Sequence, residues 1–165
     1  VLLSLITSCY QAPDFINPVY DCDCGEVAFR EQTFSLKMAE AVIADSTEEL
    51  SRTYHIVAEM RSENQVIAHQ EGHDLTFYLD FEQVGDGVFY IPQDSVIHLV
   101  QEINHSDGQF PVRDYLATVG TIEIDVAEAG GEETVSFEMD LLERVNGDLV
   151  GLTIPFSGSF SVFID

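Results

Sequence analysis

Apolar and polar residues alternate along much of the chain with a period of two. In residues 74–83, DLTFYLDFEQ, one side of the alternation holds Leu75, Phe77, Leu79 and Phe81. This period is typical of a strand with one buried face. Residues 52–61, RTYHIVAEMR, repeat it, and their inward positions are Tyr54, Ile56, Ala58 and Met60. Both segments are therefore expected to be half-buried strands.

The C-terminal third predicts a series of strands joined by tight turns. Gly130-Gly131 is expected to form a turn between two strands. The inward residues of the first strand are Ile122, Ile124 and Val126, and those of the second are Val135, Phe137, Met139 and Leu141. Asn146-Gly147 indicates a hairpin, because a type I′ turn requires positive φ at both central positions. In the last strand, GSFSVFID, the residues expected on one side are Phe160, Val162 and Ile164.

Two segments give mixed signals. Residues 34–45, FSLKMAEAVIAD, are expected to form a strand because their even positions are apolar, at Phe34, Leu36, Met38 and Val42. Residues 111–117, PVRDYLA, are expected to form a helical turn inside a loop. Pro92 is expected to end a strand, since proline has no N–H to donate to a neighbour.

The strand pattern predicts an all-β fold. About seven to ten short strands separated by turns favour a single antiparallel β-sandwich, and a calycin-like β-barrel is the alternative. The 165 residues fit one domain, which we expect over residues 26–165. A chain of this length buries about two-thirds of its unfolded surface and needs no covalent staple.

The charge of the chain excludes some partners. There are 30 acidic residues against 6 basic ones, which gives a formal net charge of −24. Nucleic-acid binding requires Lys and Arg to neutralise phosphates, so no nucleic-acid partner is expected. Electrostatic docking onto anionic lipid is excluded for the same reason. The charge is expected mainly to keep an exposed protein soluble.

The N-terminal segment indicates an anchor. Residues 1–8, VLLSLITS, are too short to span a bilayer and are expected to be the remnant of a signal peptide. Ile6-Thr7-Ser8-Cys9 resembles a bacterial lipobox, which implies cleavage before Cys9 and lipidation of its thiol. The alternative is a buried first strand with a core cysteine. Residues 9–25 are expected to be a lipid-anchored tether, because Pro13 and Pro18 oppose regular structure.

A lipobox followed by an acidic all-β body and a closing GSFSV strand is similar to the small lipoproteins of Bacteroidota. The resemblance implies a lipid-anchored protein of the bacterial cell envelope, at the periplasmic or the surface face of the outer membrane. It supplies no catalytic residues. Its implied partners are the membrane, through the lipid, and an envelope protein or glycan.

Cys22 and Cys24 remain once Cys9 is assigned to the lipid. Thiols of an exported protein meet an oxidising compartment, where they tend to pair. A disulfide between these two cysteines is therefore expected first, then free thiols, then a metal site.

One short segment offers candidate metal ligands. His69, Glu71 and His73 alternate in AHQEGHDL and would face the same way in an extended strand. Two imidazoles and a carboxylate can hold Zn²⁺ with a position left open for water. The alternative is a polar loop between two strands. A structural Ca²⁺ is also compatible with the acidic surface, but no ligand set for it stands out.

No catalytic signature occurs in the chain: G-x-S-x-G, H-E-x-x-H, the P-loop and the dinucleotide fingerprint are all absent. The leading expectation is a non-enzymatic binding or structural module, which predicts an exposed apolar or aromatic patch. The alternatives are a metal-supported binder or hydrolase and a carrier of small hydrophobic ligands, which needs an open barrel interior. Because Trp is absent, Tyr78 and Tyr90 are the candidate platforms for stacking a sugar.

Overall fold

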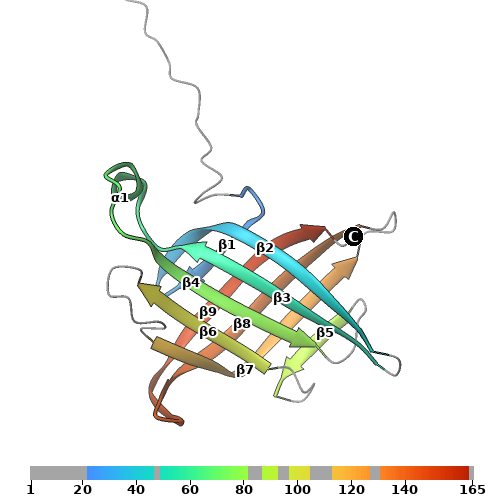
Figure 1. The fold of residues 1–165 in the computed structure, drawn as a ribbon. Coiled ribbons are helices and arrows are strands. Elements are labelled where there is room, and N and C mark those ends of the chain that lie inside the picture. The colour runs from blue at the N-terminus through green and yellow to red at the C-terminus, as the bar shows by residue number, and fades with distance from the viewer. Residues whose placement is uncertain are drawn as a thin grey trace, which may run out of the picture.

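The structure is a computed structural model that describes residues 22–46, 49–81, 87–92, 97–104, 113–126 and 131–163. This part of the chain contains nine strands and one short helix (Figure 1). Their bounds are β1 Gly25–Phe29, β2 Gln32–Ser46, β3 Glu49–Glu59, α1 Glu63–Ile67, β4 His73–Phe81, β5 Gly87–Ile91, β6 Ile97–Asn104, β7 Arg113–Val126, β8 Glu132–Val145 and β9 Asp148–Phe163.

Eight of the strands close into an antiparallel barrel in the order β1-β2-β3-β4-β6-β7-β8-β9. The barrel closes because β1 pairs with β2 on one edge and with β9 on the other. The ninth strand, β5, pairs with the second half of β7, beyond the segment that pairs with β6. The all-β expectation is confirmed, whereas the sandwich is wrong and the barrel alternative describes the molecule better. Alternation along a strand is the same in both architectures, and only the pairing of the first strand with the last distinguishes them.

The core fills the middle of the barrel with aromatic rings. Phe77 and Phe156 pack edge to face with centroids 5.1 Å apart, and Phe29 and Tyr115 do so at 5.5 Å. Phe137 lies 4.9 Å from Phe156. An eight-stranded barrel has an interior just wide enough to be filled by side chains, and these rings occupy it.

The predicted inward faces of the clearest strands are confirmed. The fully buried side chains include Leu75, Phe77 and Leu79 on β4 and Tyr54, Ile56 and Ala58 on β3. On β8 and β9 the predicted residues Val135, Phe137, Met139, Leu141, Phe160 and Val162 are buried as well. Asn146 and Gly147 both have positive φ, 53° and 95°, in the turn between β8 and β9, as predicted. β5 ends at Ile91, immediately before Pro92.

Two predictions of local structure need correction. Residues 34–45 do lie in a strand, but a register shift between Leu36 and Met38 breaks its single apolar face, so Leu36 is buried while Val42 is 57% exposed. Residues 113–117 belong to β7 and are not a helical turn. Tyr115 pairs with Val100 of β6 and with Glu143 of β8, and pairing on both edges fixes the extended conformation.

Candidate functional site

The two described cysteines are joined in a disulfide. Cys22 and Cys24 have a Cα–Cα distance of 5.1 Å. The backbone N–H of Cys22 donates to the carbonyl of Leu36, and the carbonyl of Cys24 accepts from the N–H of Ser161. The cystine therefore ties the start of β1 to β2 and β9. Cys9, the predicted lipidation site, lies outside the described residues, as do residues 1–8.

The structure does not bring the three predicted metal ligands together. His69 and Glu71 are exposed in the connection between α1 and β4, whereas His73 is the first residue of β4. His69 has a positive φ of 54°, so the segment is not the continuous strand that the alternation requires. Within the described ranges, no three His, Cys, Asp or Glu side chains form a group that could hold a metal ion.

His73 instead joins a polar cluster at one end of the barrel. Its Nε2 lies 3.0 Å from Oε1 of Glu102, whose other oxygen accepts from the hydroxyl of Tyr115 at 3.1 Å. Arg30 donates to the same hydroxyl and lies 3.3 Å from Glu102. Burial raises the pKa of Tyr115 to about 12. We call Arg30, His73, Glu102 and Tyr115 the Glu102 cluster.

A second buried cluster lies at the other end of the barrel. Glu133 accepts from the hydroxyl of Tyr54 at 2.6 Å and forms an ion pair with Arg52. Arg52 also donates to the Tyr54 hydroxyl, and burial raises the pKa of Tyr54. We call Arg52, Tyr54 and Glu133 the Glu133 cluster. The apolar core therefore ends in an acid–tyrosine–arginine cluster on each side.

Sequence reasoning missed both clusters, although a signal was present. Glu133 lies two residues before Val135, in phase with the buried positions of β8. Glu102 likewise lies two residues after the buried Val100. A charged residue in phase with an inward apolar series predicts a buried, paired charge.

The basic residues are all engaged with acids. Lys37 Nζ lies 2.5 Å from Asp74, and Arg61 donates to both oxygens of Glu59 at 2.8 Å. The six basic residues of the chain have as carboxylate partners Glu102 for Arg30, Asp74 for Lys37, Glu133 for Arg52, Glu59 for Arg61, Glu143 for Arg113 and Asp114 for Arg144. The rest of the acidic surface is therefore not neutralised by the protein's own cations.

The hairpin between β8 and β9 carries exposed apolar side chains. Their exposed fractions are 43% for Val145, 44% for Leu149, 40% for Val150 and 89% for Leu152. We call these four residues the apolar tip. The hairpin projects from one end of the barrel, at the lower left of Figure 1. Among the described strands, β1 pairs with β9 only at residues 156–160, so the segment before Phe156 is flanked by β8 alone.

Comparisons with known proteins found no match: no family model, no curated protein and no solved structure resembles the chain. In the described part of the chain, no helix has the length and apolar character needed to cross a membrane.

Proposed function

We propose that the protein is a non-enzymatic binding module of a bacterial cell envelope, anchored by a lipid on Cys9. It binds another envelope protein through the apolar tip. The observation that carries this proposal is the exposure of four apolar side chains on one hairpin, with Leu152 at 89%. Exposed apolar side chains gathered on one projecting element are typical of an interaction site.

The charge of the chain limits what can cover the apolar tip. A second copy would bring another net charge of −24, and repulsion between like charges disfavours that contact. An anionic lipid surface is disfavoured for the same reason. The partner is therefore a different protein, with an apolar contact surface and a neutral or basic rim.

The anchor is tested by metabolic labelling with an alkyne analogue of palmitate in a bacterial host that processes lipoproteins. The full chain is expected to be labelled and to sediment with membranes, whereas Cys9→Ala is not labelled. A matched control, Cys22→Ala with Cys24→Ala, keeps the label because it leaves Cys9 in place. Labelling that survives Cys9→Ala would contradict the anchor.

The apolar tip is tested with a photo-crosslinking amino acid at Leu152 and, as a control, at Ile67 on α1, which is 65% exposed. A protein crosslinked only from Leu152 is identified, purified and titrated with the full chain. Leu152→Asp is expected to weaken that complex at least about tenfold, which corresponds to about 1.4 kcal/mol, while Ile67→Asp leaves it unchanged. Equal effects of both substitutions would contradict the proposal. Dimerisation of the pure chain, or binding to phosphatidylcholine vesicles, that depends on Leu152 would assign the tip to another occupant.

The alternative functions gain no support from the geometry. His69, Glu71 and His73 do not converge, so a metal-supported binder or hydrolase has no ligand set in this segment. The aromatic rings of the core occupy the space that a small hydrophobic ligand would need. Neither arrangement favours a second candidate function.

A further inference from the structure

The outer wall of the barrel carries a groove away from the apolar tip, lined by polar side chains together with Val88 and Phe137. The groove has a volume of about 440 Å³ and crosses β7, β8, β9 and β1. Short side chains form its floor: Ser136 on β8, Ser157 and Ser159 on β9, and Ala28 on β1. Ser136 pairs across the strands with Ser159, and Ser157 pairs with Ala28. We call this feature the outer groove.

Two glycines allow β1 and β9 to lie close together where the barrel closes, and one of them, Gly158, lines the outer groove. A Cβ added at Gly158 would lie 2.6 Å from the carbonyl oxygen of Glu26. At Gly25, where φ is 143°, it would lie 2.1 Å from the carbonyl oxygen of Ser159. Only glycine therefore allows β1 and β9 to approach this closely.

Carboxylates that can accept hydrogen bonds lie beside the short side chains of the outer groove. Glu26, Glu123 and Glu138 line the outer groove and are exposed. None of them is engaged in a hydrogen bond or ion pair with another residue that the structure describes, and every basic residue is paired elsewhere. The groove thus presents charged acceptors together with serine and threonine hydroxyls, and its own chain supplies no cation to them.

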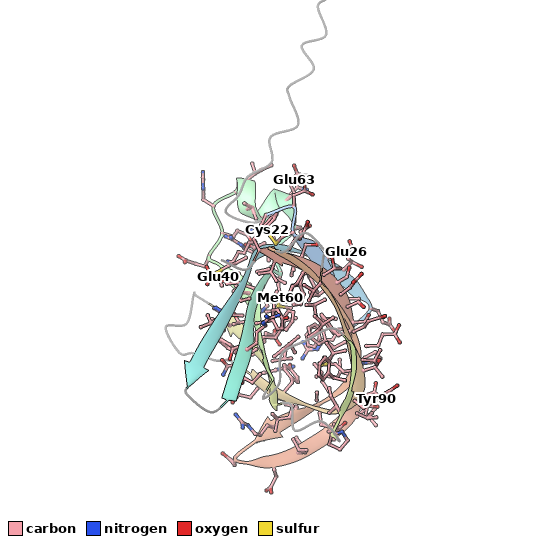
Figure 2. The ribbon with its side chains drawn as sticks, turned by 90° about the vertical axis from the view of Figure 1, so that its right-hand side faces the viewer. Cys22, Glu26, Glu40, Met60, Glu63 and Tyr90 are labelled. Carbon is pink, nitrogen blue, oxygen red and sulfur yellow. A yellow bond between two sulfur atoms is a disulfide. The ribbon has the colours of Figure 1, made fainter. Side chains whose placement is uncertain are left out.

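Val88 of β5 lines the outer groove, and Tyr90 follows two residues later on the same exposed face of β5. Tyr90 of β5 pairs with Thr121 of β7, which in turn pairs with Glu138 of β8, so the three residues share one row across the sheet. Tyr90 is 49% exposed. In Figure 2, Glu26 and Tyr90 lie on the same outer side of the barrel wall, at the right of the view.

We propose that the outer groove binds a short stretch of a neutral oligosaccharide. Sugar hydroxyls donate to the carboxylates of Glu26, Glu123 and Glu138, which accept strong charge-assisted hydrogen bonds. The floor serines both donate to and accept from the same ligand. One sugar ring places its C–H face on Tyr90, since aromatic rings offer a large, rigid contact surface. Acidic sugars are excluded by the unneutralised carboxylates.

The position of Tyr90 favours a glycan over a cationic peptide. Lysine and arginine side chains would be attracted by the carboxylates alone, at many points of a surface with this net charge. A ring beside hydroxyls on the same face of the sheet is the combination that a polar ligand with one apolar face requires.

Binding is tested by NMR on the isotopically labelled full chain. The probes are cellohexaose, chitohexaose, mannohexaose and laminarihexaose, with hexalysine as the cationic comparison. At least one oligosaccharide is expected to shift the amide signals of Ser136, Ser157 and Thr121. Ser136→Leu fills the hollow without touching the core and is expected to abolish binding. Tyr90→Ala is expected to weaken binding about threefold to tenfold, as the loss of an aromatic contact does.

The matched control is Tyr78→Ala, which removes another outward tyrosine, on β4, where it stacks on His55. It is expected to leave the oligosaccharide affinity unchanged, and unfolding midpoints of all variants show whether each one is folded. The proposal is overturned if none of the four oligosaccharides binds, if hexalysine alone binds, or if Ser136→Leu binds as well as the unchanged chain.

Discussion

A buried ion pair lies at one end of the barrel interior. Glu133 is 2% exposed and Arg52 is 7% exposed, so neither charge is solvated by bulk water. Each depends on the other and on the hydroxyl of Tyr54. Burying a charge is costly unless it is paired and hydrogen-bonded, so removing one member costs more than removing both.

Glu133→Ala tests this dependence. It leaves the guanidinium of Arg52 buried without its carboxylate, and the free energy of unfolding is expected to fall by about 3–5 kcal/mol. The double variant Arg52→Met with Glu133→Leu removes both charges, and its free energy of unfolding is expected to fall much less. Urea unfolding measures both, and the exposed neighbour Glu132→Ala should stay within about 0.5 kcal/mol of the unchanged chain. A double variant as unstable as Glu133→Ala would contradict the argument.

Tyr115 links stability to alkaline pH. Burial raises its pKa to about 12, from an ordinary value of about 10. The folded state therefore holds this proton more tightly than the unfolded state does. The resulting stabilisation is complete below pH about 10 and is lost as the pH rises through about 12. Unfolding free energies measured between pH 9 and pH 12 should decline less steeply for Tyr115→Phe than for the unchanged chain, and parallel declines would count against this role.

At the scale of elements, the turn between β1 and β2 places two non-glycine residues in a backbone conformation that favours glycine. Arg30 and Glu31 both have positive φ, 51° and 63°. A turn with two such residues favours Asn-Gly, because a Cβ in this conformation costs about 1–2 kcal/mol per residue. Arg30 is held there by its contacts to Glu102 and Tyr115. Glu31 is exposed, and no contact within the described part of the chain accounts for it.

Glu31→Gly is therefore expected to stabilise the protein. The gain should be about 0.5–1 kcal/mol in the free energy of unfolding, because glycine adopts positive φ without steric cost. Glu138→Gly is the matched control. The same substitution inside β8 should destabilise, since glycine in a strand gains flexibility on unfolding and loses its packing. Urea unfolding distinguishes the two, and a loss of stability in Glu31→Gly would show that the side chain matters at the turn.

At the scale of the whole molecule, the chain carries a net charge of −24, and all of its lysines and arginines are paired with carboxylates. Repulsion among the remaining carboxylates opposes compaction. The closed sheet and its aromatic core stabilise the fold against this repulsion. Because salt screens the repulsion, the stability of the fold is expected to depend on ionic strength more than on any particular ion.

Thermal unfolding in NaCl tests this balance. The midpoint is expected to rise as NaCl increases from about 0.01 M to about 0.5 M, because the screening length falls from about 30 Å to a few ångströms. Ca²⁺ and Mg²⁺ at equal concentration should have equal effects, and EDTA none. A midpoint raised much further by Ca²⁺ or Zn²⁺ would reveal a specific metal site, since an ion that binds only the folded state must stabilise it.

The sequence by itself determined the clearest strands, in β3, β4, β8 and β9, and which side of each of them is buried. A period-two alternation of apolar residues encodes both, as Leu75, Phe77 and Leu79 on β4 and the inward residues of β8 show. It also located the Asn146-Gly147 turn, because backbone conformation there follows from residue type. These are local properties, set by neighbours along the chain.

Only the tertiary structure decided the rest. The pairing of β1 with β9 makes a barrel from strands that would equally suit a sandwich. The same closure brings Ser136, Ser157 and Ala28 side by side in the outer groove and places Arg52 against Glu133, residues far apart in sequence. The pairing of β4 with β6 gave His73 its partner Glu102, while the positive φ of His69 broke the extended segment that would have aligned His69, Glu71 and His73. Contacts across strands depend on register and closure, and a single strand's alternation carries no information about either.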